Sequence, residues 1–297
     1  MILNKHAAGK GNIFIHSTLP PGLPSALFAE EPRFFFTIEY IFDSIYPNIC
    51  RRREDIRRPA PGRRASQTRG EIYTMILQAA LSVLIGYALG NFSPAFLLGK
   101  TKGYDVREEG SGNVGATNVF ILLGKNAFFI TALLDMFKAF AACRLCAAAF
   151  PALPTAAALG GAGCILGHIY PAVLHFRGGK GLASLGGVIL AWSWRWFFVF
   201  LALAAAIAFG TRYVCLAAPS VSVIFPLTYY WRTGMLASAL ILLAVAVPVF
   251  AKHWENFRRI RTGEEMRTSF IWDKEGELKR IGKWNPKTES QLDRRGR

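Results

Sequence analysis

The sequence predicts an all-α, polytopic membrane protein with about seven transmembrane helices. Of its 297 residues, 52% are hydrophobic and only 18% are charged, and the mean hydropathy is +0.28. A soluble protein of this length has about 25% charged residues. Long apolar runs lie between Met75 and Phe250 and are separated by Gly, Pro and single charges. This pattern excludes a soluble two-domain enzyme and a disordered chain.

Residues 1–74 differ in composition from the rest of the chain. They include eight arginines between Arg51 and Arg69, and no apolar run reaches the ~20 residues that a membrane span requires. The charged stretch follows the apolar patches, which is the reverse of a secretory signal peptide. We therefore expect a poorly ordered basic leader that is not native, with Met75 as the natural start. The alternative is an amphipathic membrane anchor.

Apolar segments suited to membrane helices follow one another from Met75 onward. They cover residues 75–99, 126–150, 153–175, 181–191, 193–210, 213–231 and 234–251. The fourth is short, and it can cross only if it packs among other helices or the bilayer is locally thin. Abundant Gly and Ala should let the helices approach closely. We expect a seven-helix membrane domain over 75–252 and a cytoplasmic helix with a basic tail over 253–297.

The net charge of +16 is gathered beside the apolar segments, mostly in Arg51–Arg69 and from Lys252 to the C-terminus. Such charge is typical of segments that flank a membrane, so nucleic acid is not the expected partner. With seven crossings, loops 100–125 and 176–180 share one face with the C-terminal tail and hold most of the core's Lys and Arg. Positive charge marks the cytoplasmic side. The leader would then lie outside, against this rule, which is a second reason to treat it separately.

The first of three polar clusters on this face is the segment GSGNVGATN, residues 110–118. Its glycines match G-x-G-x-x-G, but no strand precedes them, so a dinucleotide-binding fold is not indicated. A Gly-rich loop exposes backbone N–H groups that suit a phosphate or carboxylate. The side chains of Ser111, Asn113, Thr117 and Asn118 add further donors. The alternative is a tight polar loop that re-enters the helix bundle.

The second cluster is Arg177-Gly178-Gly179-Lys180-Gly181. It is not a Walker A loop, because Gly181 stands where Ser or Thr is required. Glycines around a lysine at the start of a helix still favour a phosphate site, since the backbone can come close and the ammonium adds charge.

The third cluster, HWENFRRIRTGE, covers residues 253–264 and continues the last apolar segment. On one helix, His253, Asn256 and, one position past the next turn, Arg261 could face inward. The alternative is a basic helix that lies on the lipid surface.

Other chemically notable residues have structural interpretations. Asp135 and Lys138 are one helical turn apart and should form an internal ion pair. His168 and His175 should be interfacial or hydrogen-bonded, because no metal-ligand spacing is present and no metal site is predicted. The five cysteines show no disulfide framework, and the Cys143-Arg-Leu-Cys146 pair should pack as small residues at a helix interface.

The order of GSGNVGATN, FRGGKG and HWENFRRIRTGEE, each at a cytoplasmic helix end, resembles the bacterial PlsY family of acyl-phosphate:glycerol-3-phosphate acyltransferases. The likeness runs from about Met75 to Arg267. It implies a seven-span enzyme of the bacterial cell membrane that works on the cytoplasmic face. It further implies transfer of a fatty acyl group from acyl phosphate to the 1-hydroxyl of glycerol 3-phosphate, which gives lysophosphatidic acid and phosphate and begins phospholipid synthesis. No cofactor and no nucleic acid are implied, membrane lipid is a partner, and a monomer is compatible with the activity.

The resemblance also implies roles for residues of the three clusters. Catalysis is expected of Ser111, Lys180, His253 and Asn256. Binding of substrate or phosphate is expected of Gly110, Gly112, Asn113, Thr117, Asn118, Gly178, Gly179 and Gly181. Acyl phosphate is already activated, so direct attack without an acyl-enzyme is expected. Either the departing phosphate or His253 is then the base.

One position departs from the family pattern. The first motif commonly ends in Arg three positions after its final Asn, and here that position is Ile121. Lys125, a turn further on, is a possible replacement for the missing cation. A competing hypothesis is a transporter for a small phosphorylated anion. A transporter would distribute polar groups through the bilayer midplane. Here the polar groups gather at one face, which favours an enzyme.

Overall fold

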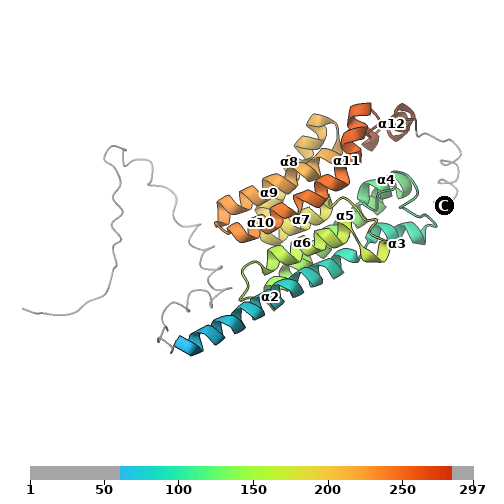
Figure 1. The fold of residues 1–297 in the computed structure, drawn as a ribbon. Coiled ribbons are helices and arrows are strands. Elements are labelled where there is room, and N and C mark those ends of the chain that lie inside the picture. The colour runs from blue at the N-terminus through green and yellow to red at the C-terminus, as the bar shows by residue number, and fades with distance from the viewer. Residues whose placement is uncertain (1–60, 283–297) are drawn as a thin grey trace, which may run out of the picture. The chain divides into compact units, whose positions relative to one another are not determined.

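The computed structural model describes residues 61–282, and these residues form helices and loops without a strand (Figure 1). The expectations for residues 1–60 and for the tail after 282 lie outside the described residues. Each predicted apolar segment is helical. The helices that correspond to them are α2 (Pro61–Asn91) with α3 (Pro94–Thr101), α5 (Lys125–Ala149), α6 (Ala156–Ile169), α7 (Leu182–Trp192), α8 (Trp194–Thr211), α9 (Ala217–Thr233), and α10 (Leu236–Ala244) with α11 (Ala246–Thr262).

In the described part of the chain, five helical stretches are long and apolar enough to cross a membrane. They are Gly70–Thr101, Ala156–Leu174, Trp194–Thr211, Val214–Thr233 and Leu236–Thr262. The apolar helix α7 is shorter, with 11 residues, and the 25-residue α5 carries charged side chains in its interior. The membrane class is therefore confirmed, whereas the number of crossings stays a prediction.

The first helix differs from the expected segment at both ends. It begins at Pro61, upstream of Met75, so residues 61–74 of the expected leader are helical. It ends at Asn91, and Ser93 caps the next helix by accepting a hydrogen bond from the Phe96 N–H at 3.3 Å. Pro94, at the start of α3, lacks an N–H and favours this break.

Small residues bring α2, α5 and α6 close together, as the composition predicts. A Cβ on Gly86 of α2 would collide with the backbone of Gly160 in α6, and one on Gly163 would collide with the backbone of Val83. Cys143 and Cys146 are buried on α5, where their sulfurs face the glycines of α6. The interpretation of this cysteine pair as interface packing is confirmed.

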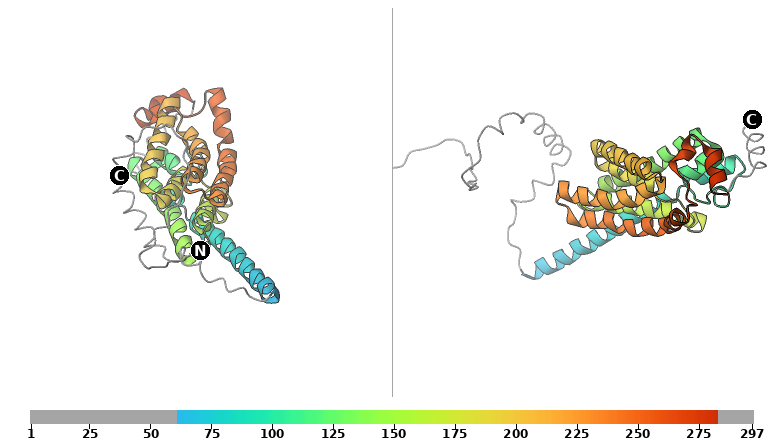
Figure 2. Two further views of the ribbon diagram at one scale, coloured as in Figure 1. Left: turned by 90° about the vertical axis from the view of Figure 1, so that its left-hand side faces the viewer. Right: turned by 90° about the horizontal axis from the view of Figure 1, so that it is seen from above.

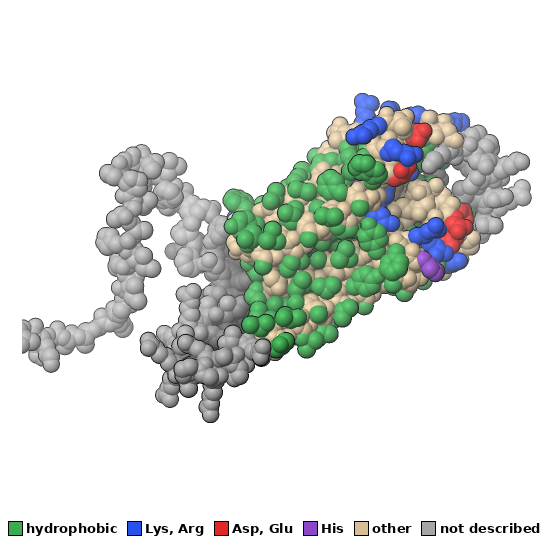
Figure 3. All heavy atoms as spheres, in the orientation of Figure 1, with side chains coloured by type: hydrophobic (Ala, Val, Ile, Leu, Met, Phe, Trp, Pro, Cys, Tyr) green, Lys and Arg blue, Asp and Glu red, His purple; other side chains and the backbone are tan. Residues whose placement is uncertain are grey.

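The outer surface of the bundle is apolar. Few residues of the α2–α3 span and of the α8 span are buried, and large apolar side chains such as Leu84, Leu201 and Val247 are exposed. Figure 2 shows α2 on one side of the bundle, with its first half extending past the other helices. In Figure 3, hydrophobic side chains cover the body, while charged side chains gather at the end that holds α3, α11 and α12 (Lys274–Arg280).

Helix α7 is one continuous helix that leads away from this charged end. Its first residue, Leu182, lines the cavity described below, and its last residue, Trp192, packs on Phe225 and Tyr229 in the second half of α9, with ring centroids 5.7 and 5.3 Å apart. Helix α7 is therefore not a hairpin. The glycine–lysine loop before it and the end of α11 lie at the same end of the bundle.

Candidate active site

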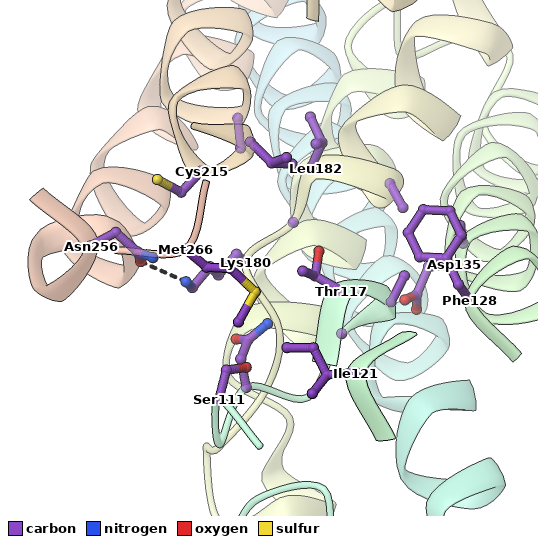
Figure 4. A pocket seen from close by; sticks show the side chains of 18 of the residues that line it. Ser111, Thr117, Ile121, Phe128, Asp135, Lys180, Leu182, Cys215, Asn256 and Met266 are labelled. Atoms are coloured by element: carbon purple, nitrogen blue, oxygen red, sulfur yellow. Dashed lines mark hydrogen bonds between the residues drawn. The ribbon is translucent and has the colours of Figure 1, made fainter. Parts of the chain in front are cut away.

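A cavity of about 1190 Å³ opens among the helices at the charged end (Figure 4). Residues from all three polar clusters line it: Gly110, Ser111, Asn113 and Thr117 from the first, Lys180 and Gly181 from the second, and His253 and Asn256 from the third. Apolar side chains of α5, α7, α8 and α9 form the remaining walls. They include Phe128, Leu133, Leu182, Ile189, Phe197, Leu201, Ala204 and Val221. The convergence of the three clusters is thus confirmed, although they are far apart in sequence.

The first cluster is a tight loop that leads into the short helix α4 (Ala116–Leu123). Gly110 and Gly112 have φ values of 65° and 69°, which favour glycine. Asn118 is fully buried and holds the loop: its Oδ1 accepts from the Ser111 N–H at 2.7 Å, and its Nδ2 donates to the carbonyls of Val106 (2.8 Å) and Glu109 (3.0 Å). Gly112 and Asn118 do not line the cavity. Their positions indicate that they hold the shape of the loop and do not contact a substrate directly.

The second cluster rests on the end of α6. The Gly179 N–H donates to the His168 carbonyl at 3.0 Å, and a Cβ on Gly178 or Gly179 would collide with His168. These two glycines lie outside the cavity lining, whereas Lys180 and Gly181 form part of it. The glycines therefore allow close packing that carries Lys180 to the cavity wall.

Lys180 is the first member of a chain of polar contacts. Its Nζ donates to Asn256 Oδ1 at 2.5 Å, Asn256 Nδ2 donates to Glu265 Oε1 at 2.7 Å, and Arg259 Nε donates to Glu265 Oε2 at 2.9 Å. Figure 4 shows Lys180 and Asn256 joined across the cavity end, with Ser111 on the opposing loop. Burial lowers the pKa of Lys180 to about 8. The negative charge of Glu265 acts in the opposite direction and raises this pKa, but its effect is smaller.

His253 is buried on α11 and has a defined tautomer. Its Nδ1 lies 2.7 Å from the Val249 carbonyl oxygen, which can only accept, so Nδ1 carries the hydrogen. In the neutral ring, Nε2 then has a free lone pair. Asn256 is also buried, and both face inward as predicted. The prediction for Arg261 is wrong: it is exposed, because it lies one position past the inward-facing turn.

Two charged residues of the site were not singled out in the sequence. Arg259 and Glu265 line the cavity and pair at 2.9 Å. Arg259 lies within the third cluster, and the signal for Glu265 was the carboxylate pair Glu264-Glu265 at the end of that cluster. Residues beyond it, including Met266 and Phe270, add a further wall, and Phe270 stacks edge-on against Phe120 of α4 at 5.4 Å.

The cation missing from the first motif is not replaced by Lys125. Ile121 occupies the cavity wall, whereas Lys125 is exposed at the start of α5 and lies outside the lining. Arg259 is the cavity-lining cation other than Lys180 within the described residues.

The ion pair predicted inside α5 is confirmed, and it has a third member. Lys138 Nζ lies 2.7 Å from Asp135 Oδ1, and His168 Nδ1 lies 3.2 Å from the same oxygen. His168 is thus a hydrogen-bonded residue of the interior, as expected, while His175 is exposed. Within residues 61–282, no group of three or more His, Cys, Asp or Glu could hold a metal ion.

A sequence model of the glycerol-3-phosphate acyltransferase family matches residues 80–263. The chain belongs to this family. The matched range contains the first two polar clusters and all of the third except Glu264, so it ends before Glu265. Among similar PlsY-family proteins, the glycerol-3-phosphate acyltransferase of Symbiobacterium thermophilum is 38% identical over 184 residues, which cover 62% of this chain and 92% of that protein. The enzyme of Bradyrhizobium diazoefficiens is 39% identical over 196 residues, with 65% and 98% covered.

The fold is similar to that of a solved family member. The crystal structure of PlsY, an integral membrane glycerol 3-phosphate acyltransferase, in its glycerol 3-phosphate form matches with a TM-score of 0.60 at 30% identity, and covers 65% of this chain and 96% of that one. A lysophosphatidic acid form of PlsY matches with a TM-score of 0.57 at 31% identity, with 64% and 94% covered. The chain is therefore an integral membrane acyltransferase.

Proposed function

We propose that this protein transfers a fatty acyl group from acyl phosphate to the 1-hydroxyl of glycerol 3-phosphate, and releases lysophosphatidic acid and phosphate. The observation that carries the proposal is a single cavity with a cationic, donor-rich end and long apolar walls. Both substrates have a phosphate, and the acyl phosphate and the product also have a long apolar chain. A cavity with a polar end and apolar walls can hold the phosphate and the acyl chain at the same time.

The phosphate of glycerol 3-phosphate is placed at the polar end. Lys180 supplies an ammonium that can form a charge-assisted hydrogen bond, and the first loop supplies the polar side chains of Ser111, Asn113 and Thr117, because the Ser111 and Gly112 N–H groups are already donated to Asn118 Oδ1 and the Glu109 carbonyl. Asn256 links Lys180 to Glu265, which orients the ammonium. Catalytic roles for Ser111, Lys180, His253 and Asn256, and the binding role of the surrounding glycines, remain proposals on this basis.

The acyl chain is placed against α5, α7 and α8. This wall continues outward, because Leu133 and Met136 also line a smaller apolar groove of about 340 Å³ with Phe137, Phe140 and Leu190. Leu133 and Phe137 are exposed on the apolar surface. A lipid substrate can therefore enter sideways from the membrane, with its phosphate directed to the charged end.

The transfer needs no covalent enzyme intermediate. The 1-hydroxyl oxygen attacks the acyl carbonyl, the C–O bond to phosphate breaks, and phosphate leaves with the bonding electrons. The hydroxyl proton goes to His253 Nε2, whose lone pair is available in the tautomer fixed by Val249, or to the departing phosphate. We propose His253 as the acceptor, because it lines the cavity and its Nδ1 hydrogen leaves Nε2 unprotonated in the neutral ring.

We also propose that the membrane domain crosses seven times, with α5 and α7 as crossings, and that the cavity faces the cytoplasm of a bacterial cell. On the face drawn in Figure 3, the Lys and Arg side chains gather at the charged end of the bundle, which supports this orientation. Cysteines placed beside Lys180 and His253, on a background without native cysteines, should both be labelled by an impermeant thiol reagent from the cytoplasmic side only. Labelling of either from the opposite side would refute the orientation.

The decisive test of activity is to incubate the purified protein with acyl phosphate and radiolabelled glycerol 3-phosphate, and to follow labelled lysophosphatidic acid. We expect labelled lysophosphatidic acid and free phosphate to form in equal amounts. The alternative function, transport of a small phosphorylated anion, predicts uptake of glycerol 3-phosphate into proteoliposomes without any acylated product.

A further inference from the structure

A buried cluster of three ionisable side chains lies beneath the glycine–lysine loop. Two of its members, Asp135 and His168, also line the cavity, but the proposed reaction gives the cluster no role. Asp135, Lys138 and His168 are each less than 10% exposed. Asp135 and Lys138 come from α5, and His168 comes from the end of α6. Ionisable groups inside a membrane protein are expensive and usually serve a function.

The charge balance of this cluster is complete without His168. Lys138 Nζ lies 2.7 Å from Asp135 Oδ1, and it also donates to the carbonyls of Phe92 (2.6 Å) and Gly90 (3.2 Å) at the end of α2. These contacts satisfy the ammonium and two carbonyls that the helix end leaves unpaired. His168 Nδ1 nevertheless joins the cluster, 3.1 Å from Lys138 Nζ and 3.2 Å from Asp135 Oδ1.

The opposite edge of the His168 ring touches the loop. A Cβ on Gly179 would collide with His168 Nε2 and would lie only 2.7 Å from the Val114 carbonyl oxygen. The His168 carbonyl also accepts the Gly179 N–H at 3.0 Å. One residue thus holds Gly179 through both its ring and its backbone, directly before Lys180.

We propose that His168, fixed in orientation by Asp135 and Lys138, is a positioning residue that sets the place of the Lys180 ammonium through Gly179. The inference rests on the proposed function, since it assigns a purpose to the phosphate-binding loop. His168 also lines the cavity, and the proposal assigns it no contact with the phosphate or with the reacting atoms. It couples the ends of α2, α5 and α6 to the loop, so that the loop is rigid before the substrate arrives.

Two substitutions distinguish the contact made by His168 Nδ1 from the contact made by His168 Nε2. In His168→Asn, the amide replaces Nδ1 and retains the contact with the cluster, but nothing reaches Gly179. In His168→Gln, the longer side chain places its amide near Nε2 and restores that contact. We expect His168→Asn to raise the KM for glycerol 3-phosphate about tenfold with kcat changed less than twofold, and His168→Gln to recover most of the loss.

A double-mutant cycle with Lys180→Ala tests whether the effect passes through the lysine. We expect His168→Asn to have no further effect on binding of glycerol 3-phosphate in the Lys180→Ala background. Equal effects in both backgrounds would overturn the proposal, because they would indicate a general structural role. Leu242→Ala, a core truncation in α10 away from the cavity, is the control for lost stability. It should lower the melting temperature without changing KM.

Direct binding distinguishes failure of this inference from failure of the proposed function. Calorimetric titration of the wild type and both His168 variants with glycerol 3-phosphate, and separately with inorganic phosphate, needs no turnover. If the wild type binds these anions but makes no lysophosphatidic acid, the function is wrong while the binding cycle still decides the role of His168. If the wild type binds neither anion, both proposals are overturned.

Discussion

Lys180 and Asn256 are 76 positions apart in the sequence, yet the Lys180 ammonium donates a 2.5 Å hydrogen bond to the Asn256 side-chain oxygen. The contact joins the loop before α7 to the last helix of the bundle. Asn256 is held from its other side by Glu265. The lysine thus has a fixed position at the polar end of the cavity before any phosphate binds, and this reduces the entropy lost on binding.

Replacing Lys180 should nearly abolish acyl transfer. Lys180→Ala removes one charge-assisted phosphate contact, which is worth roughly 2–3 kcal/mol, and we expect a ~30–100-fold loss of kcat/KM. The protein should still migrate as a single species in detergent. Lys102→Ala, at an exposed lysine outside the cavity, is the matched control and should retain activity. Full activity of Lys180→Ala would remove this lysine from the site.

The activity should fall as the pH rises through the pKa of Lys180. That pKa is lowered to about 8, so the ammonium is charged below this pH and neutral above it. Because only the charged form pairs well with phosphate, kcat/KM for glycerol 3-phosphate should decline above pH ~8. Lys180→Arg stays charged at every accessible pH and should lose this decline. An identical decline in both proteins would assign it to another group.

His253→Gln tests the proton acceptor. The amide can accept a hydrogen bond near the position of Nε2 but cannot act as a base. If His253 takes the hydroxyl proton, kcat should fall about 10²–10⁴-fold, the usual contribution of general base catalysis. A loss of less than about tenfold would assign the proton to the departing phosphate.

Ser111 should never carry an acyl group. It is exposed on the first loop, and within the described residues its hydroxyl makes no hydrogen bond to a histidine or lysine that could activate it. Mass spectrometry of protein quenched during turnover with acyl phosphate should show an unmodified Ser111 peptide. An acylated Ser111 that forms and decays at the rate of turnover would contradict direct transfer.

The apolar wall at Gly186 should set which acyl chains are accepted. A Cβ built there would lie 3.6 Å from Phe197, an ordinary contact, so Gly186→Ala should be tolerated. The larger side chain of Gly186→Leu would fill the cavity between α7 and α8. We expect activity with hexadecanoyl phosphate to fall about tenfold more than activity with octanoyl phosphate, measured as initial rates. Equal losses for both donors would place the acyl chain elsewhere.

The membrane class of the protein and the positions of its polar clusters were predictable from the sequence. Apolar segments of about 20 residues are the length that crosses a bilayer as a helix, so their positions follow from the hydropathy pattern. Gly178 and Lys180 were singled out because glycines beside a lysine favour a phosphate site, and the structure places Lys180 in the cavity wall and Gly178 outside it. His253 and Asn256 were found because one helical turn separates them, and both proved to be buried. These features depend on local spacing alone.

Only the tertiary structure decided which side chains contact one another. Asn118 has the same donor groups as Asn113, yet it holds the loop from beneath while Asn113 lines the cavity. Glu265 is placed beside Asn256 by the turn after α11, and His168 is placed under Gly179 by the packing of α6 on α5. The physical reason is that helical periodicity fixes the direction of a side chain from its own axis, whereas its partners depend on the packing of helices distant in sequence.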